Sequence, residues 1–334
     1  MWLKVFGLLL LVGSVASLTR DTKLRELRDL SNYINSAQSS WTATDDHEFT
    51  ADVKMQFMQA SCSKSKNKTF NAVQHSEEDY KKLPKNYDVR EKWGEKCPVV
   101  KHIRDQSSCG SCWAFGATEA ISDRICIKSD GKKQAFISAA HAIGCAFGDG
   151  CDGGFPESVY GLYHTDGLVT GGDYNSKQGC WPYPFPQCAH HTNSTHYPAC
   201  KKKMYPKPKC VSKCSNKKYK VSFKNDRHFG QKGYNIVGVN NIKAEIYKHG
   251  SIFEDFIAYK NGIYEHLTGE FLGYHAVKLI GWGQDEKGNG FWIVANSWNN
   301  GWGEKGFFKI YEGECEIEED ASASLPDFNR SPSF

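Results

Sequence analysis

Thirteen cysteines in a chain of 334 residues constrain the fold of this protein more than any other feature of its sequence. Seven of them lie between Cys145 and Cys214, in a stretch rich in glycine and proline where loops are expected. Cysteines are mostly paired in an oxidising compartment and kept as thiols in a reducing one. The compartment that receives the chain therefore decides how this stretch folds.

The first seventeen residues are typical of a cleavable signal peptide. Lys4 precedes an apolar run over residues 5–12, and small residues follow at positions 14–17. This run is too short to cross a bilayer as an anchor. We therefore expect export to a secreted or lysosomal destination, where the cysteines form disulfides. Two glycosylation sequons, at Asn67 and Asn193, fit the same route.

The formal net charge of +4 comes from 42 basic and 38 acidic residues. It is too small and too scattered to indicate a nucleic acid or an anionic membrane as a partner.

The rest of the chain divides at Leu83. Residues 18–82 begin with apolar positions at helical spacing (24, 27, 30 and 34) among charged residues, which predicts an amphipathic helix. Beyond Leu83 we expect a helix over residues 112–125, then loops, and finally strands over residues 275–282, 290–296 and 306–311. A helix early and strands late predict an α+β fold, in which a helical lobe packs against a β-rich lobe.

The strongest local signal is Gln-Ser-Ser-Cys-Gly-Ser-Cys-Trp, from Gln106 to Trp113. Its second cysteine, Cys112, stands where the predicted helix begins, and the helix dipole stabilises a thiolate there. A thiolate is the form of cysteine that attacks carbonyl carbons. The alternative is a redox pair of Cys109 and Cys112, but the surrounding residues lack the strand–helix–strand pattern of a thioredoxin-like protein.

A nucleophilic thiol needs a base, and the base needs a group that orients it. We expect His275, which opens an apolar strand, to be the base, and Asn296, at the end of the next strand, to accept its N–H. Trp298 would shield that hydrogen bond from water, and the amide of Gln106 would donate to the oxyanion. Each residue alone has an ordinary structural explanation, and the joint order of the four polar groups favours catalysis.

These motifs resemble those of the papain family of cysteine proteases, in particular its cathepsin B-like branch. Ser-Trp-Thr-Ala at residues 40–43 resembles a propeptide of that branch, and Leu-Pro-Lys-Asn-Tyr-Asp-Val-Arg at 83–90 resembles the start of a mature enzyme. The resemblance implies a signal peptide over 1–17, an inhibitory propeptide over 18–82, and a papain-like peptidase domain with two lobes over 83–334. It also implies hydrolysis of peptide bonds through an acyl-enzyme on Cys112, in a secreted zymogen.

By the same resemblance, Cys-Ala-His-His at residues 188–191 opens an occluding loop that runs to about Cys200. In the family, His190 and His191 would bind the carboxylate of a substrate, so that C-terminal dipeptides are removed. His190 is also expected to pair with Asp105. A zinc site made from these histidines with Cys188 and Cys200 is the alternative, which an oxidising compartment disfavours.

The resemblance further implies the remaining site residues and partners. Gly153 and Gly154 would bind the substrate backbone, and Asp320 would form the floor of the S2 pocket, although its acidic run also suits a solvated surface. Expected partners are protein and peptide substrates, the chain's own propeptide and cystatin-like inhibitors, for a monomer without metal or cofactor. Cys112 and Cys315 would keep their thiols, and the implied disulfides are Cys97–Cys126, Cys109–Cys151, Cys145–Cys210, Cys180–Cys214 and Cys188–Cys200.

The chain departs from the family pattern near the expected site. Ser107 and Tyr274 replace glycines, and His196 and Gly301 replace a charged pair that holds the occluding loop. We therefore expect a looser loop and more endopeptidase activity. Residues 251–256 are a shortened segment, and this loss is expected to shift a strand register or open the β lobe. The alternative function is accordingly a catalytically impaired papain-fold binding protein.

Overall fold

The computed structural model describes residues 29, 31–38, 40–43, 70–190, 195–255, 261–267, 275–319 and 321–332. The signal peptide, both sequons and Cys62 lie outside these residues. Three residues singled out from the sequence also lie outside them, namely His191, Tyr274 and Asp320. No helix within the described ranges is long and apolar enough to span a membrane.

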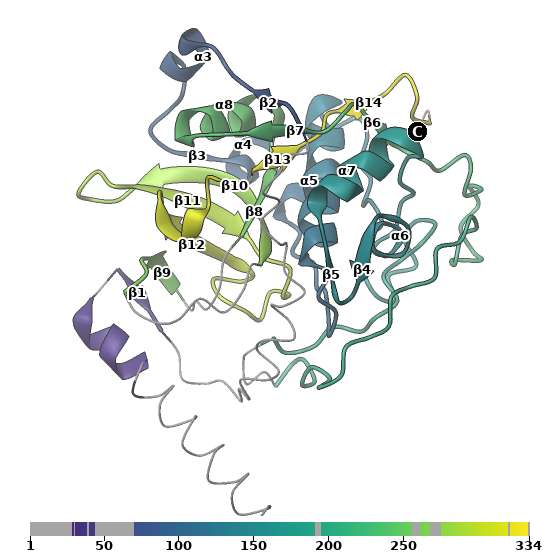
Figure 1. Cartoon of the computed structure of the whole chain (residues 1–334), viewed down its shortest axis with the longest axis horizontal. Coiled ribbons are helices and arrows are strands. Elements are labelled where there is room, and N and C mark those ends of the chain that lie inside the picture. Colours follow the sequence, from purple (N-terminus) through teal and green to yellow (C-terminus); the bar gives the residue numbers. More distant parts are fainter. Residues whose placement is uncertain are drawn as a thin grey trace, which may run out of the picture.

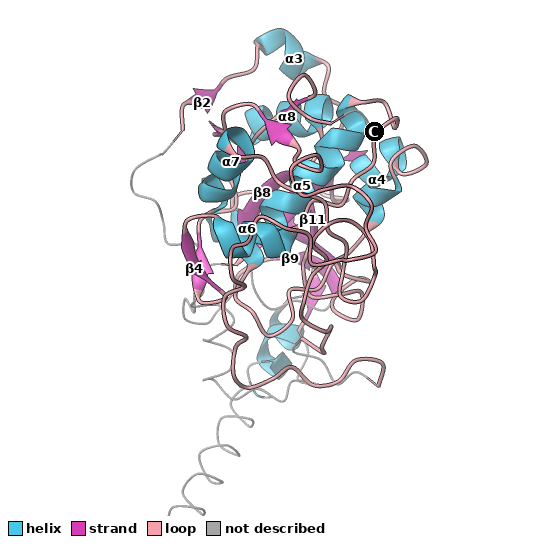
Figure 2. Ribbon diagram, turned by 90° about the vertical axis from the view of Figure 1, so that its right-hand side faces the viewer, coloured by secondary structure: helices cyan, strands magenta, loops and turns pink. Residues whose placement is uncertain are grey.

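The described residues form two lobes side by side, with helices α5, α6 and α7 on one side and a large sheet on the other (Figure 1). Helix α5 (Cys112–Lys128) lies between them, and sixteen of its seventeen residues are buried. It packs on α6 (Ala139–Cys145) and α7 (Pro156–Thr165) within one apolar core, and on the sheet at its other face. Seen from the helical side, these helices cover the sheet (Figure 2). The predicted helix over residues 112–125 therefore forms, and it continues for one more turn.

The β lobe contains a ten-stranded sheet among the described residues. Its central strands are β8 (Ile252–Asp255), β10 (Ala276–Gln284), β11 (Gly290–Ala295) and β12 (Phe307–Tyr311), all antiparallel to their neighbours along this row. Beyond β8 the order continues with β13 (Ser322–Ala323), β7 (Tyr234–Ile236) and β2 (Ala72–Val73). Helix α8 (Val239–His249) packs against β10 and β7. The three strands expected from the sequence are thus present, each within one or two residues of its expected bounds.

The expectation that the shortened segment would open the β lobe is wrong for the described part of that segment. Strand β8 pairs with β10 over four residues, from Ile252 opposite Leu279 to Asp255 opposite Ala276. On its other side, Phe253 pairs with Ser322 of β13. Because β8 has a partner on both edges, the backbone ladder holds its register even though the segment is short.

The segment before Leu83 contributes two strands to the same sheet. Strand β1 (Trp41–Thr42) pairs with β9 (Asn261–Tyr264), and β2 pairs in parallel with β7 at the far end of the sheet. Trp41 is buried in the core of the β lobe, where its ring lies 4.8 Å from that of Tyr264. The predicted amphipathic helix is helical over residues 31–37.

A short helix, α3 (Glu77–Lys81), packs this segment onto α8. Ser76 and Asp79 form a capping box at its start, and Asp79 makes an ion pair of 2.6 Å with Lys248 of α8. His75 reaches Glu245 at 2.7 Å. The segment before Leu83 is therefore fastened to the β lobe at three places, two by strand pairing and one by polar contacts.

The middle of the chain is held mainly by disulfides, apart from α7. The five disulfides join Cys97–Cys126, Cys109–Cys151, Cys145–Cys210, Cys180–Cys214 and Cys188–Cys200, the same pairs that the resemblance implies. Between α7 and β6 (Phe229–Gly230), isolated bridges are the only strand pairing among the described residues. The remaining short elements are β3 (Tyr87–Asp88), α4 (Val89–Trp93), η1 (Pro98–Lys101), β4 (Gly148–Gly150), β5 (Gly153–Gly154), η2 (Glu314–Glu316) and β14 (Pro326–Asp327).

Candidate active site

Cys112 is the first residue of α5 and is fully buried. The loop before it is fixed by the Cys109–Cys151 disulfide and by a hydrogen bond of 2.8 Å from the Gly110 N–H to the Cys151 carbonyl. Cys112 itself lies outside the five disulfides. The thiol is therefore held at the positive end of a seventeen-residue helix, where the dipole favours a thiolate.

His275 and Asn296 are brought together by the pairing of β10 with β11. His275 directly precedes β10 and Asn296 directly follows β11, and the two strands are antiparallel. The His275 Nε2 lies 2.7 Å from the Asn296 Oδ1. Because an amide oxygen only accepts hydrogen bonds, Nε2 carries the hydrogen of the neutral ring.

The other ring nitrogen of His275 is not engaged by Asn296. Its Nδ1 is buried and has no hydrogen-bond partner among the described residues. Ala276, the next residue, belongs to the same buried apolar cluster as Cys112. The geometry therefore leaves Nδ1 as the atom that can exchange a proton with a nearby thiol.

Trp298 separates this pair from the opposite loop. Its ring centroid lies 4.5 Å from that of His275 and 5.8 Å from that of His190, and the indole is nearly parallel to the His190 ring. Trp298 is itself 2% exposed. The indole thus excludes water from one side of the His275–Asn296 hydrogen bond, which strengthens that bond in a medium of low dielectric constant.

Gln106 is held at both ends of its side chain. Its Nε2 donates to the Cys109 carbonyl at 2.9 Å, and its Oε1 accepts from the Ser297 hydroxyl at 2.7 Å. The hydroxyl of Tyr183 donates to the Gln106 carbonyl at 2.6 Å. Since Nε2 has two hydrogens, one remains for a further acceptor. Ser297 and Tyr183 were not expected from the sequence. The position of Ser297 beside Asn296 could have indicated it, whereas the sequence carries no local signal for Tyr183.

The loop that begins at Cys188, the expected occluding loop, is anchored to residues 105–111, here called the catalytic loop, by one buried carboxylate. Asp105 lies 2.7 Å from the His190 Nε2, the pairing expected from the sequence. It also accepts from the Cys188 N–H at 3.1 Å and from the Asn299 amide at 2.8 Å. Asn299, which the sequence analysis missed, donates as well to the Cys188 carbonyl at 2.7 Å.

The alternative of a zinc site at this loop is contradicted by the structure. Cys188, His190 and Cys200 do lie close together, with ligand atoms within 4.8 Å of one another. The two sulfur atoms, however, are bonded to each other in a disulfide of 2.03 Å. A disulfide sulfur is not a thiolate, so it cannot serve as a zinc ligand.

A second, uncharged contact holds the tip of the loop. Gly301 has no side chain to offer, but the hydroxyl of Tyr197 donates to the Asn300 Oδ1 at 2.6 Å. A side chain at position 301 would have to fit against the Tyr197 ring, because its Cβ would lie 3.2 Å from that ring. Tyr197 and Asn300, the chain neighbours of His196 and Gly301, therefore supply a neutral contact in place of the missing charged pair.

The serine that replaces a glycine before the nucleophile also ties the loop down. Ser107 is buried and has a φ of 57°, a conformation that favours glycine. Its N–H donates to Asp105 at 2.6 Å, and its hydroxyl donates to the Pro186 carbonyl at 2.6 Å. The hydroxyl contact offsets part of the strain and connects the catalytic loop to the start of the occluding loop.

Gly153 and Gly154 form strand β5, which pairs with β4 beside the catalytic loop. Gly153 has a φ of +123°, and a Cβ on Gly154 would lie 2.4 Å from the ring of Trp113. Any other residue would push this hairpin away from α5. The two glycines therefore keep an edge of backbone next to the helix that carries Cys112.

The comparisons with known proteins agree with this geometry. Residues 83–325 match the model of a family described as papain family cysteine protease. A cathepsin B-like cysteine proteinase of Schistosoma japonicum is 46% identical over 254 residues, which is 73% of each chain. The cathepsin B-like cysteine proteinase 6 of Caenorhabditis elegans is 41% identical over 318 residues, or 90% of this chain and 83% of that protein.

Solved precursor structures are similar over almost the whole chain. Procathepsin B S9 of Trypanosoma congolense has a TM-score of 0.75 and 32% identity, covering 90% of this chain and 97% of that one. Procathepsin L 3 of Tenebrio molitor has a TM-score of 0.63 at 18% identity, covering 92% and 90%, which shows the shared fold. Family model, relatives and fold agree, and the chain belongs to the papain family of cysteine proteases, among its cathepsin B-like members.

Proposed function

We propose that Cys112 is the nucleophile of this cysteine peptidase, with His275 as its acid–base partner and Asn296 as the residue that orients His275. The observation that carries the proposal is the hydrogen bond of 2.7 Å between the Nε2 of buried His275 and Asn296, in a chain whose buried Cys112 stands at the start of α5. With Nε2 engaged, Nδ1 is the atom that takes and returns the proton.

The reaction follows from these positions. The thiolate attacks the carbonyl carbon of the substrate, and the oxyanion that forms accepts a hydrogen bond from the Gln106 amide. His275 then protonates the leaving amine, and the C–N bond breaks to leave a thioester on Cys112. Water, activated by His275, hydrolyses the thioester and releases the acid. In this proposal Gly153 and Gly154 bind the substrate backbone, and Asp320 has the role of selecting the second residue before the cleaved bond.

The segment before Leu83 is the inhibitory propeptide in this proposal, preceded by a signal peptide over 1–17. Its strands β1 and β2 pair at opposite ends of the sheet, so the segment is joined to the peptidase domain at two separate places. The enzyme is exported as a monomeric, glycosylated precursor to a secreted or lysosomal destination. Cystatin-like inhibitors are its expected partners, besides protein and peptide substrates.

The alternative of an impaired binding protein is not favoured. It rested on the shortened segment and on Tyr274, which lies outside the described residues, and β8 retains its pairing on both edges. The relatives at 41% and 46% identity are themselves described as proteinases.

The proposal is tested by acidifying the purified precursor in the presence of an epoxysuccinyl thiol inhibitor, followed by mass spectrometry. We expect loss of the segment before Leu83 and one adduct, on Cys112. A folded, processed chain that carries no adduct would contradict the assignment of the nucleophile.

The balance between two modes of cleavage depends on the occluding loop. We propose that His190 and His191 bind the carboxylate of a substrate, which favours removal of C-terminal dipeptides while the loop is closed. Internal bonds become accessible when it opens. The Tyr197–Asn300 hydrogen bond opposes opening, so the loop is held more firmly than the missing charged pair alone would indicate.

Replacing Tyr197 by phenylalanine is expected to raise internal cleavage relative to dipeptide removal by about two- to tenfold. One hydrogen bond contributes about 0.5–1.5 kcal/mol net, and this amount is lost from the closed state. The measurement compares kcat/KM for one peptide with a free C-terminus and with an amidated one. Tyr174→Phe, at an exposed tyrosine, is the control. An unchanged ratio in Tyr197→Phe would show that this contact does not hold the loop.

A further inference from the structure

The charge of the chain is concentrated in one segment, contrary to the inference drawn from its net value. Residues 201–224, here called the lysine segment, contain ten lysines and no arginine, aspartate or glutamate. The net charge of the chain is +4, so the residues outside this segment carry a formal net charge of −6, which is +4 minus +10. The lysine segment therefore carries a strong excess of positive charge, and the rest of the chain carries an excess of negative charge. The ten lysines are Lys201, Lys202, Lys203, Lys207, Lys209, Lys213, Lys217, Lys218, Lys220 and Lys224.

All ten lysines are exposed. No carboxylate within the described ranges lies within 4.0 Å of any of their amines, whereas six other lysines form such ion pairs. The acidic residue that follows the segment, Asp226, is buried and accepts from Thr170 and Tyr219. An ordinary solvated surface mixes both signs of charge, and this one does not.

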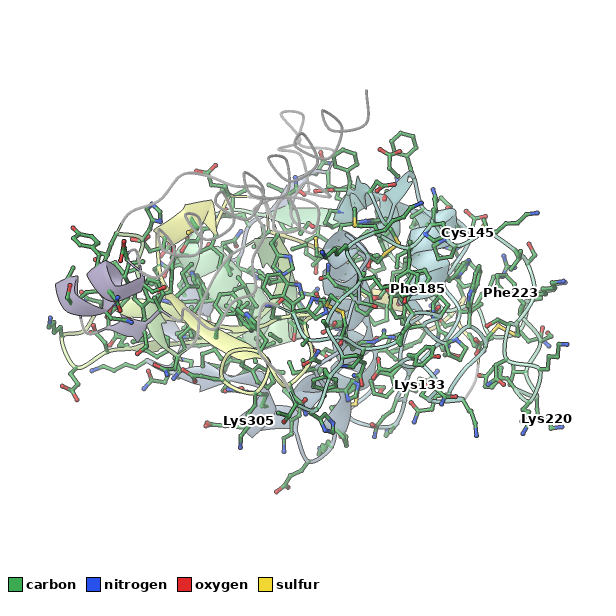
Figure 3. All side chains as sticks on the ribbon, turned by 90° about the horizontal axis from the view of Figure 1, so that it is seen from below. Lys133, Cys145, Phe185, Lys220, Phe223 and Lys305 are labelled. Atoms are coloured by element: carbon green, nitrogen blue, oxygen red, sulfur yellow. A yellow bond between two sulfur atoms is a disulfide. The ribbon has the colours of Figure 1, made fainter. Side chains whose placement is uncertain are left out.

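The lysine segment has a fixed path although it lacks helices and strands. Cys210 and Cys214 tie it to α6 and to the loop at Cys180. It runs along the side of the helical lobe away from the sheet (Figure 1), and Lys220 lies at that outer edge (Figure 3). Because the backbone is already ordered, binding of a partner does not carry the entropic cost of ordering it.

One end of the segment borders the catalytic loop. The N–H groups of Lys201 and Tyr205 donate to the hydroxyl and carbonyl of Ser108, at 2.7 and 2.9 Å. The amine of Lys207 donates to the Gly148 carbonyl at 2.7 Å, and its side chain covers Gly150. Both glycines belong to β4, the partner of the strand that carries Gly153 and Gly154. The lysine segment thus borders the strand pair that carries Gly153 and Gly154.

We infer that the lysine segment is an exosite for acidic protein substrates, which it binds outside the cleft while Cys112 cleaves a neighbouring bond. The inference rests on the proposed function. Positive charge bordering a cleft raises the local concentration of acidic substrates and their association rate. Lysines along a fixed surface attract carboxylates without requiring a single geometry, which suits substrates of varied sequence.

A nucleic acid fits this surface less well. The segment has no arginine for bidentate contacts with phosphates. Its aromatic rings are already engaged: Tyr205 stacks on Phe185 at 4.2 Å, and the Phe223 ring packs edge-on against His141 at 5.2 Å. Bases would therefore find no open ring to stack on in these two places.

The test uses two fluorogenic peptides with the same cleavage sequence, one followed by a glutamate-rich extension and one by a glutamine-rich extension. At low salt we expect kcat/KM of the processed enzyme to be at least about tenfold higher for the acidic peptide. The preference should decline as salt is raised, because counter-ions screen exposed charges. The variant Lys202→Gln, Lys203→Gln, Lys209→Gln and Lys213→Gln should lose it and still cleave the neutral peptide normally.

A matched control removes four exposed lysines elsewhere, with Lys92→Gln, Lys132→Gln, Lys232→Gln and Lys287→Gln. It should keep the preference because the lysine segment is intact, although its net charge equals that of the first variant. Equal cleavage of both peptides by the unaltered enzyme, or a preference that survives in the first variant, would overturn the inference.

Cleavage of the neutral peptide tests the proposed peptidase function alone. A failure of that function can therefore be distinguished from a failure of the exosite. The exosite has its own readout in the binding of the acidic extension to the full-length Cys112→Ala chain, measured by fluorescence anisotropy. Weak binding there would count against an exosite. Tighter binding of a DNA duplex or of anionic lipid vesicles than of the acidic peptide would overturn the assigned class of partner.

Discussion

Replacing Cys112 by alanine is expected to lower peptidase activity by about five to six orders of magnitude. The thiol that forms the covalent intermediate is lost, and the oxyanion donors and substrate contacts alone leave a small residual rate. The fold should persist, because Cys112 takes part in none of the five disulfides. The measurement is kcat/KM on a fluorogenic peptide, together with the thermal midpoint of the full-length chain.

Cys315 provides a control. It is the other described cysteine that lies outside the disulfides, and it is exposed. Cys315→Ala should retain full activity and still acquire one epoxysuccinyl adduct. The Cys112→Ala precursor should keep its N-terminal segment at acid pH, because it cannot process itself. Activity in Cys112→Ala, or an adduct that moves to Cys315, would assign the chemistry to another thiol.

The second large effect concerns a carboxyl group buried in α5. Glu119 is 5% exposed, and its Oε1 has no hydrogen-bond partner among the described residues. Burial raises the pKa of Glu119 from 4.5 to about 7, and the nearby Asp123 carboxylate adds to this, while Lys278, Arg104 and His102 oppose it. The Lys278 amine lies 2.9 Å from Asp123 but 3.7 Å from Glu119, so it mainly neutralises the former.

This raised pKa predicts that stability declines as the pH rises. Below pH 4.5 the carboxyl holds its proton in both the folded and the unfolded chain. Between about pH 4.5 and 7 the folded chain keeps the proton and the unfolded chain loses it, so the free energy of unfolding falls through this window. A shift of about 2.5 pKa units corresponds to about 3 kcal/mol. The contribution is therefore complete in acid and is lost as the pH rises through about 7.

The variant Glu119→Gln is expected to remove this decline, because its amide stays neutral at every pH. Denaturant unfolding of the Cys112→Ala chain from pH 4.5 to 8, with and without Glu119→Gln, measures the difference. Glu286→Gln, at an exposed turn, should leave the slope unchanged. A decline of the same steepness in Glu119→Gln would locate the responsible group elsewhere.

Glu119 lies in the contact between the two lobes, which gives the prediction a functional side. Helix α5 carries Cys112 at its start, and β10 begins directly after His275. Lys278 of β10 reaches across to Asp123 of α5, and the Ser251 hydroxyl donates to the same carboxylate at 2.6 Å. A charged Glu119 weakens this junction, so we expect the enzyme to hold its active geometry best at acid pH.

Much of the architecture follows from local patterns in the sequence. The apolar spacing after Cys112 specifies a helix, and short apolar runs punctuated by glycine specify β10, β11 and β12. The resemblance of short motifs to a known family supplied the cysteine pairs. Local patterns failed where the outcome depended on distant partners. Strand β8 stays paired in the sheet because β10 and β13 flank it. The length of the segment over residues 251–256 does not reveal these partners.

The sequence by itself determined the residue types of the site and their order. It does so because Cys112 stands at the start of a predicted helix, and His275 and Asn296 stand at the ends of predicted strands. The tertiary structure decided which atoms meet. It joined Asp105 to His190, put Tyr197 in reach of Asn300, and tied Gln106 to Ser297. Such contacts join residues far apart in the sequence, and a hydrogen bond or an electrostatic field depends on distances in space, which separation along the chain does not specify.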